Sequence, residues 1–138
     1  MEGNKENKAF NSEVIGLGVD ILEVDRIKDT IKRFGDKFLQ RIYTPKEINY
    51  CQSKKRSAES FAARFSAKEA FVKAVEANEV IPYSDIEVAK KESKKPQIVL
   101  HGKAKKAAEK KNITEILVSL SHEKNYVIAH IILKGRIK

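Results

Sequence analysis

The sequence predicts one α+β domain in which helices pack against a largely antiparallel sheet. Segments rich in β-branched residues indicate strands, and segments with a helical periodicity of apolar residues separate them. The predicted order is β-α-α-α-β-β-α-β-β. Strands are expected at residues 14–22, 86–90, 97–101, 116–122 and 126–133, and helices at about 23–34, 45–53, 58–77 and 102–111.

Start and stop signals mark the first two helices. After the strand VIGLGVDIL, Ile27 and Ile31 recur at helical spacing, and Gly35 suits a C-terminal stop. Thr44-Pro45-Lys46-Glu47 begins the second helix. Threonine can cap a helix, proline suits its first turn, and Glu47 in the third position completes a capping box.

The long third helix contains an exception to its own pattern. Four apolar residues share one narrow sector of a 3.6-residue helix: Phe61, Phe65, Val72 and Val75. Lys68 falls in the middle of this sector, and Glu69 follows it directly. A weak surface ion pair at i, i+4 accounts for Glu69 with Lys73, but it leaves Lys68 unexplained.

In the C-terminal half, turn residues separate paired strands. Pro82 and the Tyr83-Ser84-Asp85 turn precede one strand, and Pro96 precedes the next. Gly102 begins a short lysine-rich helix. The last two strands are joined by Glu123-Lys124-Asn125, which predicts a hairpin.

Composition is typical of one globular domain. The 138 residues are enough for a single core, and 41% of them are apolar. We expect a domain at 14–138, preceded at 1–13 by a polar, poorly ordered tail without the apolar segment of a secretory signal. No apolar run approaches the ~20 residues that span a bilayer. The single cysteine, Cys51, excludes an internal disulfide and indicates a reducing, cytoplasmic compartment.

The charge balance predicts an anionic partner. Lysine and arginine number 28 against 19 acidic residues, which gives a net charge of +9. A basic nucleic-acid-binding module is therefore the alternative function. Against it, aromatic residues make up only 7%, tryptophan is absent and the basic residues are scattered, so no nucleic-acid partner is expected. The lysine-rich helix at 102–111 carries only alanines as apolar residues, so no membrane contact is expected either.

Three local features exceed what folding requires. Asp20 ends an apolar strand, the Lys68-Glu69 pair interrupts a core helix, and His122 lies just before a hairpin. Taken singly, Asp20 suits a capping residue and His122 a structural hydrogen-bonder. Together with Lys73 they suit a magnesium–diphosphate site, because Mg²⁺ takes one or two protein carboxylates and lysines neutralise phosphate charge. The sequence contains neither a GxxxxGK[ST] loop nor a nucleophile elbow.

Three blocks in register resemble a known family. GVDILEVDRI (18–27), FAARFSAKEAFVKA (61–74) and VSLSHEKNYVIA (118–129) are similar to the signature blocks of the small holo-acyl-carrier-protein synthases, a branch of the 4′-phosphopantetheinyl transferases. The resemblance covers about residues 14–134. It implies a homotrimer with coenzyme A in clefts between subunits.

The resemblance also implies a reaction. A serine hydroxyl of an acidic apo-acyl-carrier protein attacks the β-phosphate of coenzyme A. The serine receives 4′-phosphopantetheine, adenosine 3′,5′-bisphosphate leaves, and the product supports fatty acid biosynthesis. Asp20 and Glu69 match the carboxylates that bind Mg²⁺, and Lys73 matches a lysine near the diphosphate; these three form the expected catalytic set.

The remaining matches concern the two substrates. Arg64 lies where the family has a basic contact to the nucleotide end of coenzyme A, and His122 matches a histidine that contacts a coenzyme A phosphate. Lys68 is also assigned to the phosphate surroundings. Arg26 matches an arginine that grips the carrier protein.

One turn departs from the family's pattern. A glycine-lysine-proline turn is common in the family, whereas this chain has Lys94-Lys95-Pro96. Lysine adopts a positive φ less readily than glycine does. The geometry of this turn, and of the adenine contact expected near Pro96, is therefore expected to differ.

Overall fold

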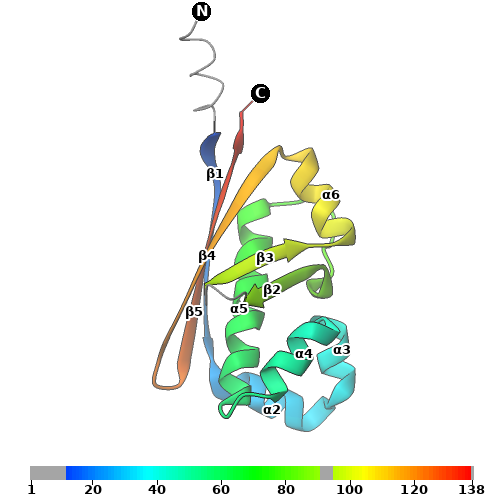
Figure 1. Cartoon of the computed structure of the whole chain (residues 1–138), viewed down its shortest axis with the longest axis vertical. Coiled ribbons are helices and arrows are strands. Elements are labelled where there is room, and N and C mark those ends of the chain that lie inside the picture. Colours follow the sequence, from blue (N-terminus) through cyan, green and yellow to red (C-terminus); the bar gives the residue numbers. More distant parts are fainter. Residues whose placement is uncertain (1–11, 91–94, 138) are drawn as a thin grey trace, which may run out of the picture.

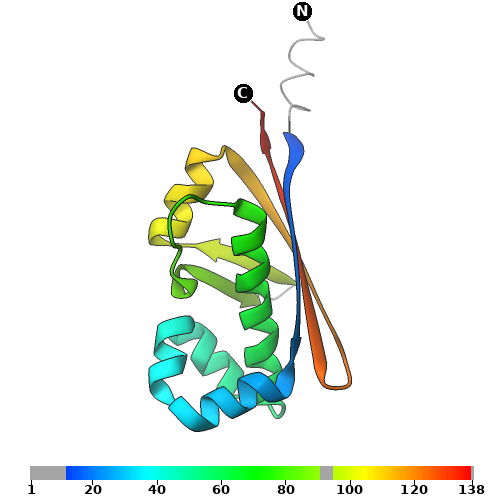
Figure 2. The same cartoon turned by 180° about the vertical axis from the view of Figure 1, so that it is seen from behind.

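A three-stranded antiparallel sheet forms one side of the molecule, in a computed structural model that describes residues 12–90 and 95–137. The strand order is β1-β5-β4. The helices of the described residues all lie on the same side of this sheet (Figures 1 and 2). The bounds of the strands are Ser12–Glu23 for β1, Ile113–Glu123 for β4 and Tyr126–Arg136 for β5.

The longest helix, α5 (Ser57–Val75), packs along the inner face of this sheet. The inward residues of β5 alternate with outward ones, so that Ala129, Ile131 and Leu133 are buried against the helix. On β1, a Cβ placed at Gly18 would lie only 1.9 Å from the carbonyl oxygen of Ala70. Only glycine allows the strand and the helix to approach this closely.

A second, two-stranded sheet covers the opposite side of α5. It consists of β2 (Ile86–Lys90) and β3 (Pro96–Leu100), which pair antiparallel. The short helix η1 (Tyr83–Asp85) leads into β2, and α6 (Gly102–Lys110) follows β3. Helix α6 packs on this part of the core through small buried alanines.

Three short helices close the end of the molecule at which β1 finishes. They enclose a second apolar cluster with the first turns of α5, and their bounds are Val24–Phe34 for α2, Asp36–Ile42 for α3 and Pro45–Gln52 for α4. Gly35 ends α2 with a φ of 58°, as expected. The predicted capping box is confirmed: Thr44 accepts from the backbone of Glu47, and the Glu47 side chain accepts from the backbone of Thr44.

The fold class is confirmed, and the order of elements differs from the prediction in one helix. Helix α3 begins directly after Gly35 and has only seven residues, too few to show a periodicity in the sequence. Strand β1 begins at Ser12, so the last two residues of the predicted tail pair with β5. Residues 1–11 of that tail, and Lys94 of the unusual turn, lie outside the described residues.

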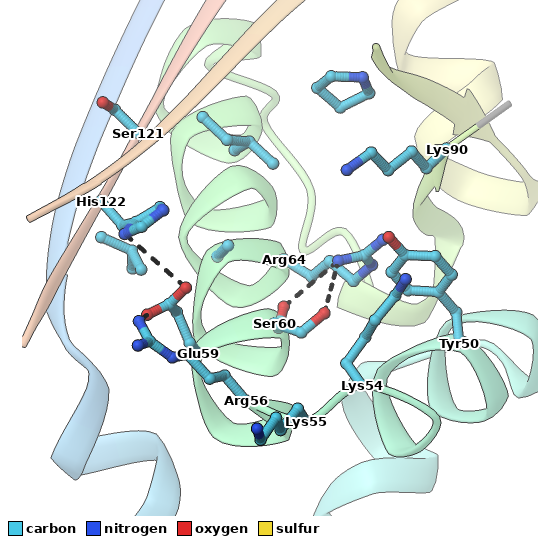
Figure 3. Close-up of a pocket in the computed structure, with 14 residues that line it drawn as sticks. Tyr50, Lys54, Lys55, Arg56, Glu59, Ser60, Arg64, Lys90, Ser121 and His122 are labelled. Atoms are coloured by element: carbon cyan, nitrogen blue, oxygen red, sulfur yellow. Dashed lines mark hydrogen bonds and ion pairs between the residues drawn. The ribbon is translucent and has the colours of Figure 1, made fainter. Parts of the chain in front are cut away.

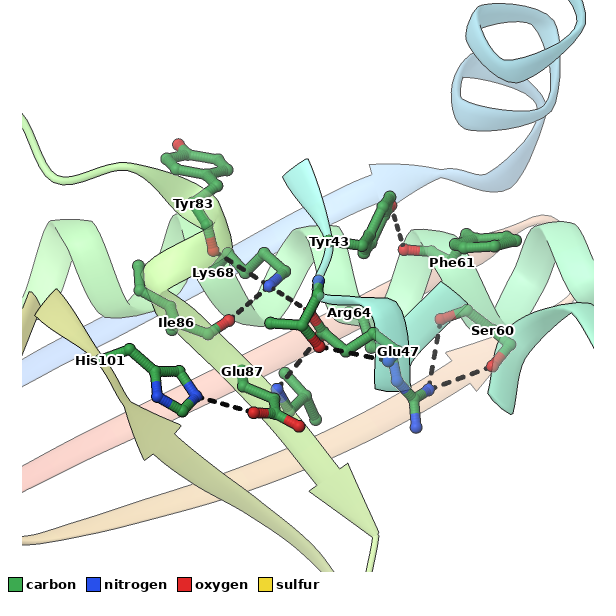
Figure 4. Close-up of polar contacts among 12 residues, drawn as sticks. Tyr43, Glu47, Ser60, Phe61, Arg64, Lys68, Tyr83, Ile86, Glu87 and His101 are labelled. Carbon is green, nitrogen blue, oxygen red and sulfur yellow. Dashed lines mark hydrogen bonds and ion pairs between the residues drawn. The ribbon is translucent and has the colours of Figure 1, made fainter. Parts of the chain in front are cut away.

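Lys68 is a component of the core, and the phosphate contact expected of it is wrong. Its side chain is 0% exposed, and its Nζ donates to Glu47 Oε1 at 2.7 Å, to the Tyr83 carbonyl at 3.0 Å and to the Ile86 carbonyl (Figure 4). Burial lowers the pKa of Lys68, and the Glu47 carboxylate opposes this shift. All three ammonium protons are used, so none remains for a ligand.

The other oxygen of Glu47 extends the same network. Glu47 Oε2 accepts from the backbone N–H of Val88 at 3.0 Å, next to the Lys68 contacts. This Lys68–Glu47 brace therefore joins α4, α5, η1 and β2 around one buried ion pair. Such a pair stabilises a fold only if every polar atom in it finds a partner.

We predict that Lys68→Met lowers the free energy of unfolding by about 3–5 kcal/mol, because it leaves the Glu47 carboxylate buried without a counter-charge. Urea denaturation measures this change. The matched control is Lys110→Met, which removes an exposed ammonium 3.5 Å from Glu79 and is expected to change stability by less than about 0.5 kcal/mol. Equal effects of the two substitutions would contradict the structural role of Lys68.

Candidate active site

One group of polar residues lies where β1 passes α5. Asp20 faces the helix because Gly16 and Gly18, four and two residues before it, also face the helix. Its Oδ2 accepts from Ser66 Oγ at 2.9 Å, and its Oδ1 lies 3.2 Å from Lys73 Nζ. Lys73 therefore pairs with Asp20, which lies within β1 and not at its end as expected, in place of the i, i+4 pairing with Glu69.

Glu69 belongs to the same group. It lies three residues after Ser66 and four before Lys73, so it shares their side of α5. Burial, a hydrogen bond to Glu69 and the negative charges of Glu69 and Asp20 raise the pKa of Tyr83 above its ordinary value. Asp20 contacts Ser66 and Lys73, which share this side of α5 with Glu69, so the two carboxylates lie on the same side of the helix. Tyr83 itself gave no signal in the sequence beyond its place in a turn.

This carboxylate group suits the expected metal. Within residues 12–90 and 95–137 there is no cluster of three or more acidic, histidine or cysteine side chains around one point. Two carboxylates are what Mg²⁺ requires from a protein when water and phosphate oxygens complete its shell. The donor set of Asp20 and Glu69 therefore fits Mg²⁺ better than it fits Zn²⁺, which prefers histidine and cysteine ligands.

A second group of residues lines a cavity of about 490 Å³ (Figure 3). Helices α4 and α5 provide one wall, β4 the opposite wall, and the ends of β2 and β3 the rim. The cavity brings together three of the residues expected to bind coenzyme A, which come from distant parts of the chain: Arg64, Pro96 and His122. His122 is exposed, and its Nδ1 lies 3.8 Å from Glu59 Oε1.

Arg64 is the only buried cation among the residues that line this cavity. It is only 6% exposed, and its Nη1 donates to Ser60 Oγ at 3.1 Å and to the Ser60 carbonyl at 3.4 Å. Its Nε is buried without a hydrogen-bond partner among the described residues. No carboxylate forms an ion pair with Arg64 in the part of the chain that the structure describes. A buried guanidinium with unused donors is prepared to bind an anion.

The sequence alone missed most of the basic residues in the cavity. Its lining also includes Lys54, Lys55, Arg56 and Lys90. The run Lys54-Lys55-Arg56 lies between the helices predicted at 45–53 and 58–77, where its polar character indicates only a connector. Its position directly before the helix that carries Arg64 was the signal that could have identified it.

The two groups occupy different sides of α5. Arg64 and Glu69 are five residues apart, which places them about 140° apart around a 3.6-residue helix. Lys68 lies close to Arg64 in direction, but it points into the core. Arg26 belongs to neither group, because it is exposed on α2 and does not line the cavity.

Comparison with known proteins assigns the family. Residues 16–130 match the model of the 4′-phosphopantetheinyl transferase superfamily. The chain belongs to this superfamily. A holo-[acyl-carrier-protein] synthase of Koribacter versatilis is 46% identical over 123 residues, which cover 88% of this chain and 98% of that protein. The transferase resemblance predicted from the three sequence blocks is thereby confirmed, as is the expectation of an enzyme.

Solved transferase structures have the same fold. The holo-[acyl-carrier-protein] synthase of Neisseria meningitidis superimposes with a TM-score of 0.80 at 31% identity, over 88% of this chain and 98% of that one. The Helicobacter pylori synthase in complex with coenzyme A gives a TM-score of 0.74 at 33% identity, over 85% and 98% of the two chains. No helix of the described residues is long and apolar enough to cross a bilayer.

Proposed function

We propose that this chain transfers 4′-phosphopantetheine from coenzyme A to a serine of apo-acyl-carrier protein and releases adenosine 3′,5′-bisphosphate. The observation that carries the proposal is the buried Arg64, which has unused donors in a cavity lined by cations. The Helicobacter pylori relative, crystallised with coenzyme A, supports the same ligand here. We place the reaction in the cytoplasm, in support of fatty acid biosynthesis, in keeping with the free thiol of Cys51.

In this proposal the cavity binds the nucleotide end of coenzyme A. Arg64 donates to phosphate oxygens through its unused N–H groups, and His122 contacts a phosphate from the opposite wall. Pro96 provides apolar contact at the rim, near the adenine. These residues hold the substrate in place, and positioning, together with electrostatic stabilisation, is almost all that a protein contributes to phosphoryl transfer.

The carboxylate group serves the diphosphate. Asp20 and Glu69 would hold Mg²⁺, which when bound neutralises charge on the phosphoryl oxygens. Lys73 already lies 3.2 Å from Asp20 and adds a point charge beside the reacting phosphate. Ser66 fixes the other oxygen of Asp20 at 2.9 Å, so the carboxylate keeps its orientation. The chain's own residues therefore orient the carboxylates and neutralise the diphosphate.

A homotrimer is part of the proposal. The outer face of the three-stranded sheet exposes a row of large apolar side chains, among them Leu17 at 62%, Val19 at 57% and Ile21 at 62%. Soluble monomers rarely expose such contiguous apolar surface, whereas subunit interfaces bury it. Because the two groups of site residues lie on different sides of α5, a neighbouring subunit is needed to bring the cavity of one chain to the carboxylates of another.

The first prediction of this proposed function is the transfer itself. The purified protein, mixed with coenzyme A, Mg²⁺ and an apo-acyl-carrier protein, is expected to add one phosphopantetheine to one serine of the carrier. Mass spectrometry of the carrier detects the product, and adenosine 3′,5′-bisphosphate should appear in equal amount. If several apo-carriers stay unmodified while a nucleic-acid probe binds with a steep salt dependence, the nucleic-acid-binding alternative replaces the enzyme.

The second prediction concerns the carboxylates. Asp20→Asn and Glu69→Gln are expected to lower kcat by at least about a hundred-fold, because metal stabilisation of the developing charge contributes several kcal/mol to catalysis. Chelation of Mg²⁺ should have the same effect on the unmodified protein. Glu79→Gln, which alters a partly exposed carboxylate paired with Lys110, is the control and should be neutral. Full turnover in excess chelator would exclude the metal.

The third prediction concerns docking of the carrier. Arg26→Glu should raise the KM for the carrier protein about ten-fold or more at low salt and leave coenzyme A affinity unchanged, because an exposed charge mainly steers encounter. The effect should fade at physiological ionic strength, where the Debye length is ~8 Å. Lys110→Glu makes the same charge change on α6, at the other end of the molecule (Figure 1), and should have little effect. Similar damage to both substrates would place Arg26 in the nucleotide site instead.

A further inference from the structure

Tyr50 carries two cations over its aromatic ring. It lies near the end of α4, where Arg64 Cζ is 4.4 Å and Lys54 Nζ is 4.6 Å from the ring centroid. Both distances are within the range of cation–π attraction. Burial raises the pKa of Tyr50, but the charges of Lys90, Lys54 and Arg64 outweigh it and lower that pKa, as expected for a phenol among cations. Figure 3 shows Tyr50 beside Arg64, with Lys54 rising toward them.

The Tyr50 ring can hold the Arg64 guanidinium in place without using its N–H donors. A carboxylate would hold a buried guanidinium in place, but it would also use the N–H donors and neutralise the charge. An aromatic ring attracts the same charge through its face and leaves the N–H groups at the edge of the guanidinium unused. Ser60 engages only Nη1, and Nε is left without a partner among the described residues. The ring and Ser60 therefore hold the Arg64 side chain in place but leave some of its N–H donors without an acceptor.

We propose that Tyr50 is a positioning residue for coenzyme A, whose ring holds Arg64 and Lys54 in the orientation in which they bind a phosphate. This inference rests on the proposed function and adds a residue outside all three sequence blocks. Tyr50 acts through the two cations. Because its ring already orders these two long side chains in the free protein, less conformational entropy is lost when coenzyme A binds. The determinant is the aromatic face, and the hydroxyl group is not required.

The test compares Tyr50→Leu with Tyr50→Phe. Calorimetric titration with coenzyme A should show a Kd raised about five- to thirty-fold in Tyr50→Leu, the range expected when a partly desolvated cation–π contact is lost. Tyr50→Phe keeps the ring and should bind like the unmodified protein. In kinetics, the KM for coenzyme A should rise in Tyr50→Leu, while kcat and the KM for the carrier protein stay unchanged. If Tyr50 only stabilised the fold, its replacement would not raise the KM for coenzyme A selectively.

A second background shows whether Tyr50 acts through Arg64. In Arg64→Gln, the further change Tyr50→Leu should weaken coenzyme A binding by much less than it does alone, because Lys54 is the only one of the two cations left. Urea denaturation of each variant checks the fold. If Tyr50→Leu is too unstable to study, Tyr50→Met removes the ring with another good helix former.

The outcomes separate this inference from the proposed function. If the unmodified protein binds no coenzyme A, the proposed function fails. If it binds coenzyme A and Tyr50→Leu binds equally well, the positioning role of Tyr50 fails while the function stands. Equal weakening in Tyr50→Phe and Tyr50→Leu would assign the effect to the hydroxyl and would also overturn the inference, as would full additivity with Arg64→Gln.

Discussion

The ion pair between Lys68 and Glu47 is the interaction on which both parts of the site depend. Lys68 also bonds the Tyr83 carbonyl, which sets the position of the phenol that meets Glu69. Glu47 belongs to α4, the helix that carries Tyr50 to Arg64. Burying two charges gives little net stability. Because each of these bonds has one geometry, we interpret the pair as a device that fixes four elements relative to each other.

Two buried cations, one turn apart on α5, illustrate how structural and ligand-binding roles differ. Lys68 reaches three oxygen acceptors inside the protein and is complete. Arg64 has more donors, but among residues 12–90 and 95–137 its contacts are with Ser60 and with the face of the Tyr50 ring. The cost of burying a charge must be offset by some partner. For Lys68 that partner is internal, whereas in our proposal the missing partner of Arg64 is a phosphate of coenzyme A.

The sequence predicts the features that depend on residues close together in the chain. The capping box and the strands follow from spacing, and Lys68 was identified as an anomaly because periodicity placed it in an apolar stripe. The pairing of Lys68 with Glu47 could not be predicted, because Glu47 lies 21 residues away in the sequence and the capping box already accounted for it. Tyr50 and Tyr83 had no sequence pattern that placed them beside Arg64 and Glu69. Such contacts depend on how helices pack, and packing is set by the whole core.

The geometry of α5 explains why one subunit alone is an incomplete enzyme in this proposal. The three-stranded sheet covers one side of α5, and β2 and α4 cover another. Only narrow strips of the helix surface therefore remain accessible to ligands. Its anion-binding strip with Arg64 and its carboxylate strip with Glu69 are separated by the core contacts of Lys68. One diphosphate ligand spans the two strips most directly if they come from different subunits. The apolar row of Leu17, Val19 and Ile21 on β1, the strand that also carries Asp20, is suited to hold such neighbours together.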